Sequence, residues 1–201
     1  MEGVAEISLL HYIERCDWDI TLFINSLNTP ATDSLWMFMS NKYIWFPMYL
    51  VVAVFLFVRL GWKRGLVAVA SLALAVTACD QFANLVKDAV ARFRPCWTDY
   101  MIRNGLHLLE GKGNYYGFFS AHAANSMMFA VGSLICFRID RKHSYNTYEW
   151  CMVIWAVLVG LSRIFVGKHF FGDVLVGLVV GWIIGWIFGK IAEIVSTRLV
   201  H

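Results

Sequence analysis

The sequence predicts an all-α membrane protein: a bundle of about five transmembrane helices preceded by one helix at the membrane surface. Of its 201 residues, 59% are hydrophobic and 15% are charged, whereas a soluble domain carries about a quarter charged residues. Apolar stretches close to the roughly 20 residues that a membrane-spanning helix needs recur along the chain. We therefore expect residues 1–201 to form a single integral-membrane domain without a large soluble part.

The N-terminal segment, residues 7–28, is the expected surface helix. It combines apolar positions at helical spacing with four charged residues, Glu14, Arg15, Asp17 and Asp19. This mixture suits a helix that lies in the membrane interface better than one that crosses the membrane. Pro30 is expected to end the helix, because proline interrupts helical hydrogen bonding.

Five apolar stretches follow and are the expected spans: residues 43–60, 65–87, 118–137, 150–166 and 174–194. The first opens with aromatic residues and closes at the basic turn 59–64, as membrane-spanning helices often do. The second is apolar except for a polar corner that begins at Asp80. The third ends at the basic turn 138–143, and a short connection at 167–172 separates the fourth from the fifth.

The fifth span carries a ridge of glycines at every fourth position: Gly177, Gly181, Gly185 and Gly189. Small residues at this spacing let another helix approach closely within a membrane. We expect the glycine ridge to pack inside the chain, with a homodimer through the same ridge as the alternative.

The basic turns predict the orientation of the protein. If successive spans alternate in direction, the turns 59–64 and 138–143 and the C-terminal tail share one side, which the positive-inside rule makes cytoplasmic. The loop 95–117 and the connection around His169 then lie on the other side. We therefore expect the protein in the cytoplasmic (inner) membrane, with its functional site on the outer, periplasmic face.

Three polar clusters fall at the outer ends of the spans, in residues 87–95, 119–122 and 162–173. Among their cations, Lys87, Arg94 and Arg163 are the candidate phosphate ligands, and guanidinium groups are suited to bidentate binding of phosphate. Ser120 and the free N–H groups that begin the third span add neutral donors. The clusters therefore predict an anion site, and no run of basic residues indicates nucleic-acid binding.

The histidines predict that the anion site is catalytic and not only a binding site. His169 and Asp173 are four residues apart, a spacing that on a helical turn places the carboxylate beside the imidazole. The carboxylate then fixes the tautomer and leaves the other ring nitrogen free as a nucleophile. His122, from another span, is a candidate general acid for the leaving oxygen. Since cationic side chains stabilise the developing charge, this phosphoryl-transfer site is expected to use no metal and no cofactor.

In these clusters the chain resembles the type 2 phosphatidic acid phosphatase family, integral-membrane phosphatases that share a fold with vanadium haloperoxidases. The first part of its signature, Lys-x6-Arg-Pro, is matched by Lys87, Arg94 and Pro95, and the third, Ser-Arg-x5-His-x3-Asp, by Ser162, Arg163, His169 and Asp173. The second, Pro-Ser-Gly-His, is matched at Ser120 and His122, with Phe119 and Ala121 in the other two positions. The family usually has six helices, which five spans plus the surface helix would supply.

The resemblance implies a phosphohistidine intermediate on His169. In that mechanism Asp173 orients His169, and His122 acts first as the leaving-group acid and then as the base for water. The groups implied to hold the phosphate are Lys87, Arg94, Ser120, the N–H of Ala121, and Arg163.

The expected function is removal of phosphate from a phospholipid or isoprenoid lipid whose tail enters sideways between helices. Candidate substrates are lipid A phosphate, undecaprenyl diphosphate, phosphatidylglycerophosphate and phosphatidic acid, and the compact size resembles bacterial members of the family. Two alternatives stay open: a phosphotransferase that passes the phosphoryl group to another lipid, and a non-catalytic anion-binding membrane transporter. A transporter would be favoured by broken helices at corresponding positions of two halves, which the sequence does not indicate.

Overall fold

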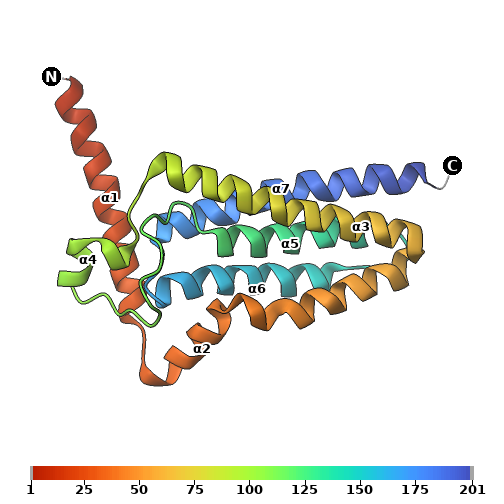
Figure 1. Cartoon of the computed structure of the whole chain (residues 1–201), viewed down its shortest axis with the longest axis horizontal. Coiled ribbons are helices and arrows are strands. Elements are labelled where there is room, and N and C mark those ends of the chain that lie inside the picture. The colour runs from red at the N-terminus through yellow and green to blue at the C-terminus, as the bar shows by residue number, and fades with distance from the viewer. Residues whose placement is uncertain (1, 200–201) are drawn as a thin grey trace.

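The computed structural model describes residues 2–199, which form helices joined by loops and turns (Figure 1). The α-helices are α1 Glu2–Ser26, α2 Pro30–Ser40, α3 Phe46–Val90, α4 Asp99–Arg103, α5 Ala121–Phe137, α6 Asn146–Phe165 and α7 Phe171–Arg198. Two 3-10 turns, η1 Lys42–Trp45 and η2 Pro95–Trp97, precede α3 and α4. The predicted all-α membrane bundle is confirmed.

Helix α3 contains the first two expected spans. Its helical geometry breaks at Gly61, where φ is 77° and ψ is 171°, a conformation that glycine adopts without a steric penalty. The chain reverses there, so that the two halves of α3 run in opposite directions and diverge from the turn (Figure 1). The predicted spans 43–60 and 65–87 therefore exist as separate helices joined at the basic turn.

Three segments in residues 2–199 are long and apolar enough to cross a membrane: Lys42–Val90, Asn146–Phe165 and Phe171–Arg198. The first has 49 residues and comprises both halves of α3. Helix α5 is shorter, with 17 residues, but it is buried along most of its length at the centre of the bundle. It begins at Ala121 and not at the expected residue 118, because Ser120 is its N-cap.

The glycine ridge of α7 packs against α5 of the same chain. All four glycines are buried, and a Cβ placed on Gly177 or Gly185 would lie 2.6 Å from the carbonyl oxygen of Ser120 or 2.5 Å from that of Met128. The expected intramolecular packing is confirmed. A homodimer through the same ridge stays a prediction.

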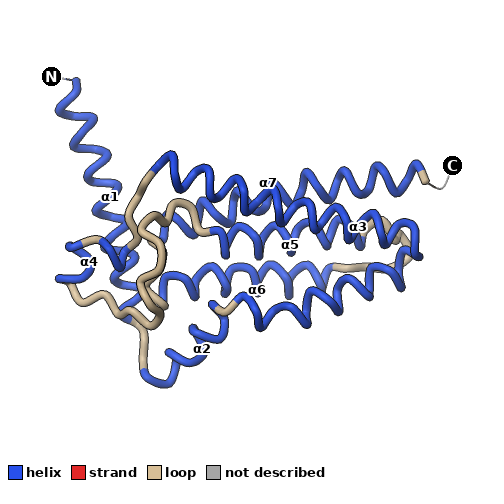
Figure 2. The backbone as a smooth tube through the Cα atoms, viewed as in Figure 1, coloured by secondary structure: helices blue, strands red, loops and turns tan. Residues whose placement is uncertain are grey.

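Helices α1 and α2 and the long loops gather at one end of the bundle (Figure 2). Helix α1 is strongly inclined to the bundle axis, as a surface helix would be (Figure 1). Its Asn25 docks it onto the end of α6, because the Nδ2 group donates to the carbonyl oxygens of Ile164 and Phe165 at 3.0 Å each. Helix α2 is not foreseen in the sequence: Pro30 begins it, at a first-turn position where proline costs no hydrogen bond.

Candidate active site

A cavity of about 470 Å³ opens at the end of the bundle that carries α2 and the long loops. Six of the predicted site residues line it: Lys87, Arg94, Ala121, His122, Arg163 and His169. They come from α3, the loop after it, α5, α6 and the connection before α7. The three clusters of the sequence therefore meet in one place, as expected from the alternation of the spans.

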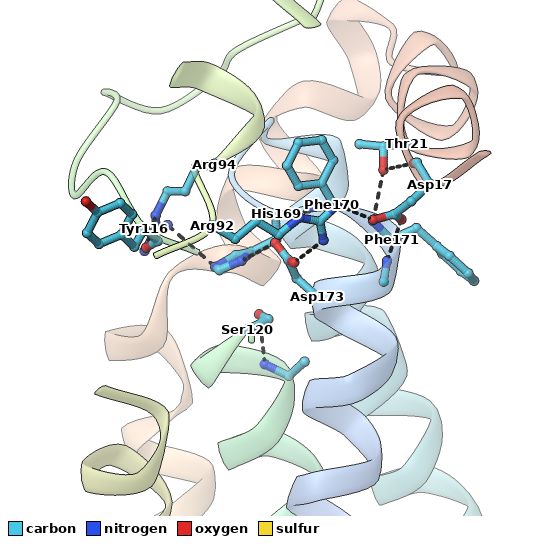
Figure 3. Close-up of polar contacts among 12 residues, drawn as sticks. Asp17, Thr21, Arg92, Arg94, Tyr116, Ser120, His169, Phe170, Phe171 and Asp173 are labelled. Carbon is cyan, nitrogen blue, oxygen red and sulfur yellow. Dashed lines mark hydrogen bonds and ion pairs between the residues drawn. The ribbon is translucent and has the colours of Figure 1, made fainter. Parts of the chain in front are cut away.

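His169 and Asp173 form the pair that the sequence predicts, with a difference in placement. His169 lies in the connection before α7, and Asp173 lies in the first turn of that helix, so the two do not share a helical turn. The imidazole Nδ1 is 3.4 Å from Oδ2 of Asp173, which also accepts the N–H of Phe170 at 3.1 Å (Figure 3). The turn into α7 thus sets the ring against the carboxylate.

The other ring nitrogen of His169 is directed toward the cations. Its Nε2 lies 3.5 Å from Nη1 of Arg94. Because a guanidinium can only donate, this arrangement favours the tautomer with the proton on Nδ1, toward Asp173, and a free electron pair on Nε2.

His169 is 2% exposed. Burial, followed by the charges of Arg94, Arg163, Lys87 and Lys168, holds the pKa of His169 well below its ordinary value. The imidazole is therefore neutral at neutral pH, which is the form that a nucleophile requires.

Arg94 is oriented by the backbone of the long loop, since its Nε donates to the carbonyl oxygen of Tyr116 at 3.0 Å. Lys168, which also lines the cavity, donates to the carbonyl oxygens of Gly111 and Lys112 in the same loop. Burial lowers the pKa of Lys168. The loop and the cations of the site therefore hold each other in place.

Arg163 has an acidic partner, Glu110, that the sequence did not predict. Its Nη1 donates to Ser40 Oγ and lies 3.4 Å from Oε1 of Glu110, and Ser40 in turn donates to Glu110. Arg163 is 5% exposed and its Nε has no partner in the described chain. Glu110 stands in a loop without a motif, so no spacing signal could have linked it to Arg163.

Ser120 and Ala121 differ in their access to the cavity. Ser120 is fully buried, and its hydroxyl accepts the N–H of Ala123 at 3.4 Å as the N-cap of α5. The residue is not among those that line the cavity, and its contact with phosphate stays a prediction. Its N–H donates to the carbonyl oxygen of Asp173 at 3.0 Å, which ties the start of α5 to the start of α7.

Arg92 is a second residue that sequence reasoning did not assign. Its guanidinium bridges two carboxylates, with Nη1 2.7 Å from Asp173 Oδ1 and Nη2 2.7 Å from Asp17 Oδ2 (Figure 3). Arg92 stands inside the Lys-x6-Arg-Pro motif, but its partners are 81 and 75 residues away. Only the folded chain brings the three together.

Comparison with known proteins settles the family. A model of the PAP2 superfamily matches residues 64–194, which is more than half of the chain. The chain belongs to the PAP2 superfamily. This confirms the resemblance of the PAP2 chain to type 2 phosphatidic acid phosphatases, because the matched range contains all three signature clusters.

Three named proteins are similar in sequence to the PAP2 chain. It is 32% identical over 193 residues to "Lipid A 4'-phosphatase" of Bacteroides thetaiotaomicron, covering 95% of this chain and 83% of the relative. It is 32% identical over 170 residues to the protein of the same name of Porphyromonas gingivalis, covering 84% of this chain and 70% of the relative. Over 177 residues it is 28% identical to "Undecaprenyl-diphosphatase" of Sulfolobus acidocaldarius, covering 85% and 77%.

Two solved structures share the fold of the PAP2 chain. One is a transmembrane PAP2-type phosphatidylglycerolphosphate phosphatase from Bacillus subtilis, with a TM-score of 0.73, 18% identity, and coverage of 90% of this chain and 87% of that one. The other is Aquifex aeolicus LpxE, with a TM-score of 0.65, 23% identity, and coverage of 86% and 93%.

Proposed function

We propose that this PAP2 protein is a membrane lipid phosphatase that uses His169 as its nucleophile. The observation that carries the proposal is the placement of His169: Nδ1 faces Asp173 at 3.4 Å, and Nε2 faces Arg94 at 3.5 Å at the wall of a cavity lined by cations. A phosphate held by those cations would present its phosphorus to a neutral nitrogen nucleophile.

The reaction has two steps. In the first, Nε2 of His169 attacks phosphorus, the bond between phosphorus and the lipid oxygen breaks, and His122 gives its proton to that oxygen. In the second, His122 takes a proton from water, the water oxygen attacks phosphorus, and the bond to Nε2 breaks to release inorganic phosphate. Arg94, Arg163 and Lys87 stabilise the negative charge in both steps.

A second cavity supports a lipid as the substrate. It has a volume of about 430 Å³ and lies between the two halves of α3 and α5, where it is lined mostly by apolar residues such as Val52, Leu72 and Phe129. Lys42, Tyr49, Asp80 and Asn125 line both cavities. An acyl or isoprenoid tail in the apolar cavity would therefore leave its phosphate in the polar one.

The substrate class follows from the chemistry and the relatives. Lipid A phosphate is the first candidate, because two relatives that are each 32% identical are named lipid A 4'-phosphatases. Undecaprenyl diphosphate, phosphatidylglycerophosphate and phosphatidic acid are further candidates, because each carries a terminal phosphate group on a lipid with apolar tails. We place the enzyme in the cytoplasmic (inner) membrane with its site on the periplasmic face, since the basic turns 59–64 and 138–143 lie at the opposite end of the bundle (Figure 1).

The test is release of inorganic phosphate by purified protein in detergent micelles containing EDTA, with the four lipids as substrates. We expect turnover of at least one lipid, loss of about 1000-fold or more of that turnover in His169→Ala, and unchanged thermal unfolding. The control is His143→Ala, because His143 contacts Asp140 and Arg59 at the other end of the bundle. Undiminished turnover in His169→Ala, or strict dependence on a divalent ion, would overturn the proposal. Transfer to an added lipid acceptor, without release of phosphate, would identify a phosphotransferase instead.

A further inference from the structure

A row of alternating charges leads from the N-terminal helix α1 to the nucleophile. Asp17 of α1 pairs with Arg92 at 2.7 Å, Arg92 pairs with Asp173 at 2.7 Å, and Asp173 lies 3.4 Å from His169 (Figure 3). The first three side chains retain little exposure, at 13%, 20% and 0% respectively. Ion pairs this enclosed are weakly screened by solvent, so a change at one end acts on the other.

Helix α1 also holds the first turn of α7. Oδ1 of Asp17 accepts the N–H of Gly172 at 2.7 Å, and Oγ1 of Thr21 accepts the N–H of Phe171 at 2.9 Å. These are N–H groups that a helix start leaves without an intrahelical partner. The turn of α7 that carries Asp173 is therefore fixed by acceptors supplied from α1.

Arg92 remains a cation in this position. Burial alone would lower the pKa of Arg92, but the carboxylates of Asp173 and Asp17 raise it above its ordinary value. Its guanidinium also lies over the ring of Phe170, 4.2 Å from the ring centre. The fork of Arg92 thus presents one N–H to each carboxylate, an arrangement that a lysine cannot reproduce.

We infer that Asp17 and Arg92 are positioning residues for the nucleophile, and that α1 is a working part of the active site. The inference rests on the proposed function of His169. Asp17 partly neutralises the positive charge of Arg92. The carboxylate of Asp173 therefore remains a good acceptor for the hydrogen bond from the Nδ1–H of His169. If Asp17 loses its charge, Arg92 draws Asp173 more strongly and His169 loses basicity. If Arg92 loses its charge, two neighbouring carboxylates make His169 more basic, but Asp173 is no longer held in place.

Several ionisable groups face His169 and must be kept constant in a test. They are Lys87 of α3, Arg94 between α3 and η2, Glu110 of the long loop, His122 of α5, Arg163 of α6, Lys168 of the connection, and Asp173 of α7 with Arg92 behind it. Neither Asp17 nor Arg92 lines the cavity, so substitutions there replace none of the side chains that do.

The experiment compares Asp17→Asn, Arg92→Gln and Arg92→Lys with the wild type in detergent micelles, using the lipid that the wild type turns over fastest. Asp19→Asn is the matched control, because Asp19 lies two residues along the same helix and contacts Tyr100. We expect kcat to fall about 10- to 100-fold in Asp17→Asn and Arg92→Gln, with KM changed by less than about threefold, and the loss to be smaller in Arg92→Lys. Asp19→Asn should match the wild type.

The deciding readout is the acid limb of kcat/KM against pH. Its midpoint should move down by about 0.5 to 1 pH unit in Asp17→Asn and up by a similar amount in Arg92→Gln. The substrate's own ionisation is common to all variants, so these opposite shifts belong to the enzyme. Two outcomes would overturn the inference: both variants behaving like Asp19→Asn, or both moving the limb in the same direction with a lower unfolding temperature. Either result, obtained while His169→Ala is inactive, leaves the proposed function standing; an active His169→Ala removes that function itself.

Discussion

Glu110 and Arg163 form an ion pair at the wall of the active-site cavity, with Oε1 3.4 Å from Nη1. Arg163 is one of the cations expected to hold phosphate, and it is almost fully buried. In the structure the guanidinium of Arg163 pairs with the carboxylate of Glu110 in the long loop. A substrate phosphate that uses Arg163 must therefore compete with Glu110 or bind beside it.

Neutralising Glu110 should strengthen substrate binding. In Glu110→Gln we expect KM for a lipid phosphate to fall about 3- to 10-fold with little change in kcat, because a like charge near the phosphate is removed at a partly screened site. The measurement is steady-state kinetics in detergent micelles. Asp99→Asn is the control, an exposed acid of α4. A rise in KM in Glu110→Gln would show that Glu110 orients Arg163 for the substrate.

Replacing Arg163 by lysine should remove most of the activity. We expect kcat/KM to fall about 100- to 1000-fold in Arg163→Lys, since a lysine keeps the charge but loses the planar fork that matches a phosphate. Arg138→Lys is the control, because Arg138 pairs with Glu149 at the opposite end of the bundle. Equal kcat/KM in wild type and Arg163→Lys would show that Arg163 does not bind the transferred phosphoryl group.

The pH dependence should reflect the lowered pKa of His169. Burial and then the surrounding cations disfavour its protonated form, so the acid limb of kcat/KM is expected below pH 6.5, the ordinary value for histidine. The same shift affects stability. Below about pH 6.5 the unfolded chain binds a proton that the folded chain does not, so stability falls with falling pH until the folded pKa is passed.

The effect on stability can be measured as the thermal unfolding temperature between pH 5 and 8. The wild type should lose more stability on acidification than His169→Asn, in which this group cannot titrate. An acid limb of kcat/KM well above pH 6.5, with equal acid sensitivity of the two proteins, would contradict the neutral nucleophile.

The close packing of α5 and α7 should tolerate no side chain on the glycine ridge. In Gly185→Ala the new Cβ would lie 2.5 Å from the carbonyl oxygen of Met128 and 3.0 Å from its Cα, both backbone atoms. We expect a loss of about 1 to 3 kcal/mol, seen as a lower thermal unfolding temperature in detergent. Gly111→Ala, where a Cβ meets nothing within 4 Å, should unfold like the wild type; equal stability of both variants would contradict the packing.

The sequence predicts the spans and the signature clusters because both are local patterns. Apolar length defines the two halves of α3, α6 and α7, and the four-residue spacing of His169 and Asp173 predicts that their side chains meet, although only Asp173 belongs to α7. Helix α2 is missed because its 11 residues are too short to read as a span. The sequence predicts a turn within residues 59–64 but not that the chain reverses at Gly61. A positive φ cannot be recognised in a sequence except by the presence of a glycine.

The contacts that complete the site could not be predicted. Arg92 reaches Asp17 and Asp173 across 75 and 81 residues, and Glu110 reaches Arg163 across 53. None of these pairs has a fixed spacing, so only the folded arrangement reveals them. Ser120 has a structural contact that the motif does not reveal, because its hydroxyl also accepts the N–H of Ala123 and caps α5.

A covalent bond between phosphorus and Nε2 of His169 is the central intermediate of the proposed reaction. The most direct measurement is rapid mixing with lipid labelled in its phosphate by phosphorus-32, followed by an alkaline quench and peptide mapping of the label. We expect transient labelling that is stable to alkali and lost in acid, located on His169, and absent from His169→Ala. Full turnover with no label on the wild-type protein, or the same label and rate in His169→Ala, would contradict the account.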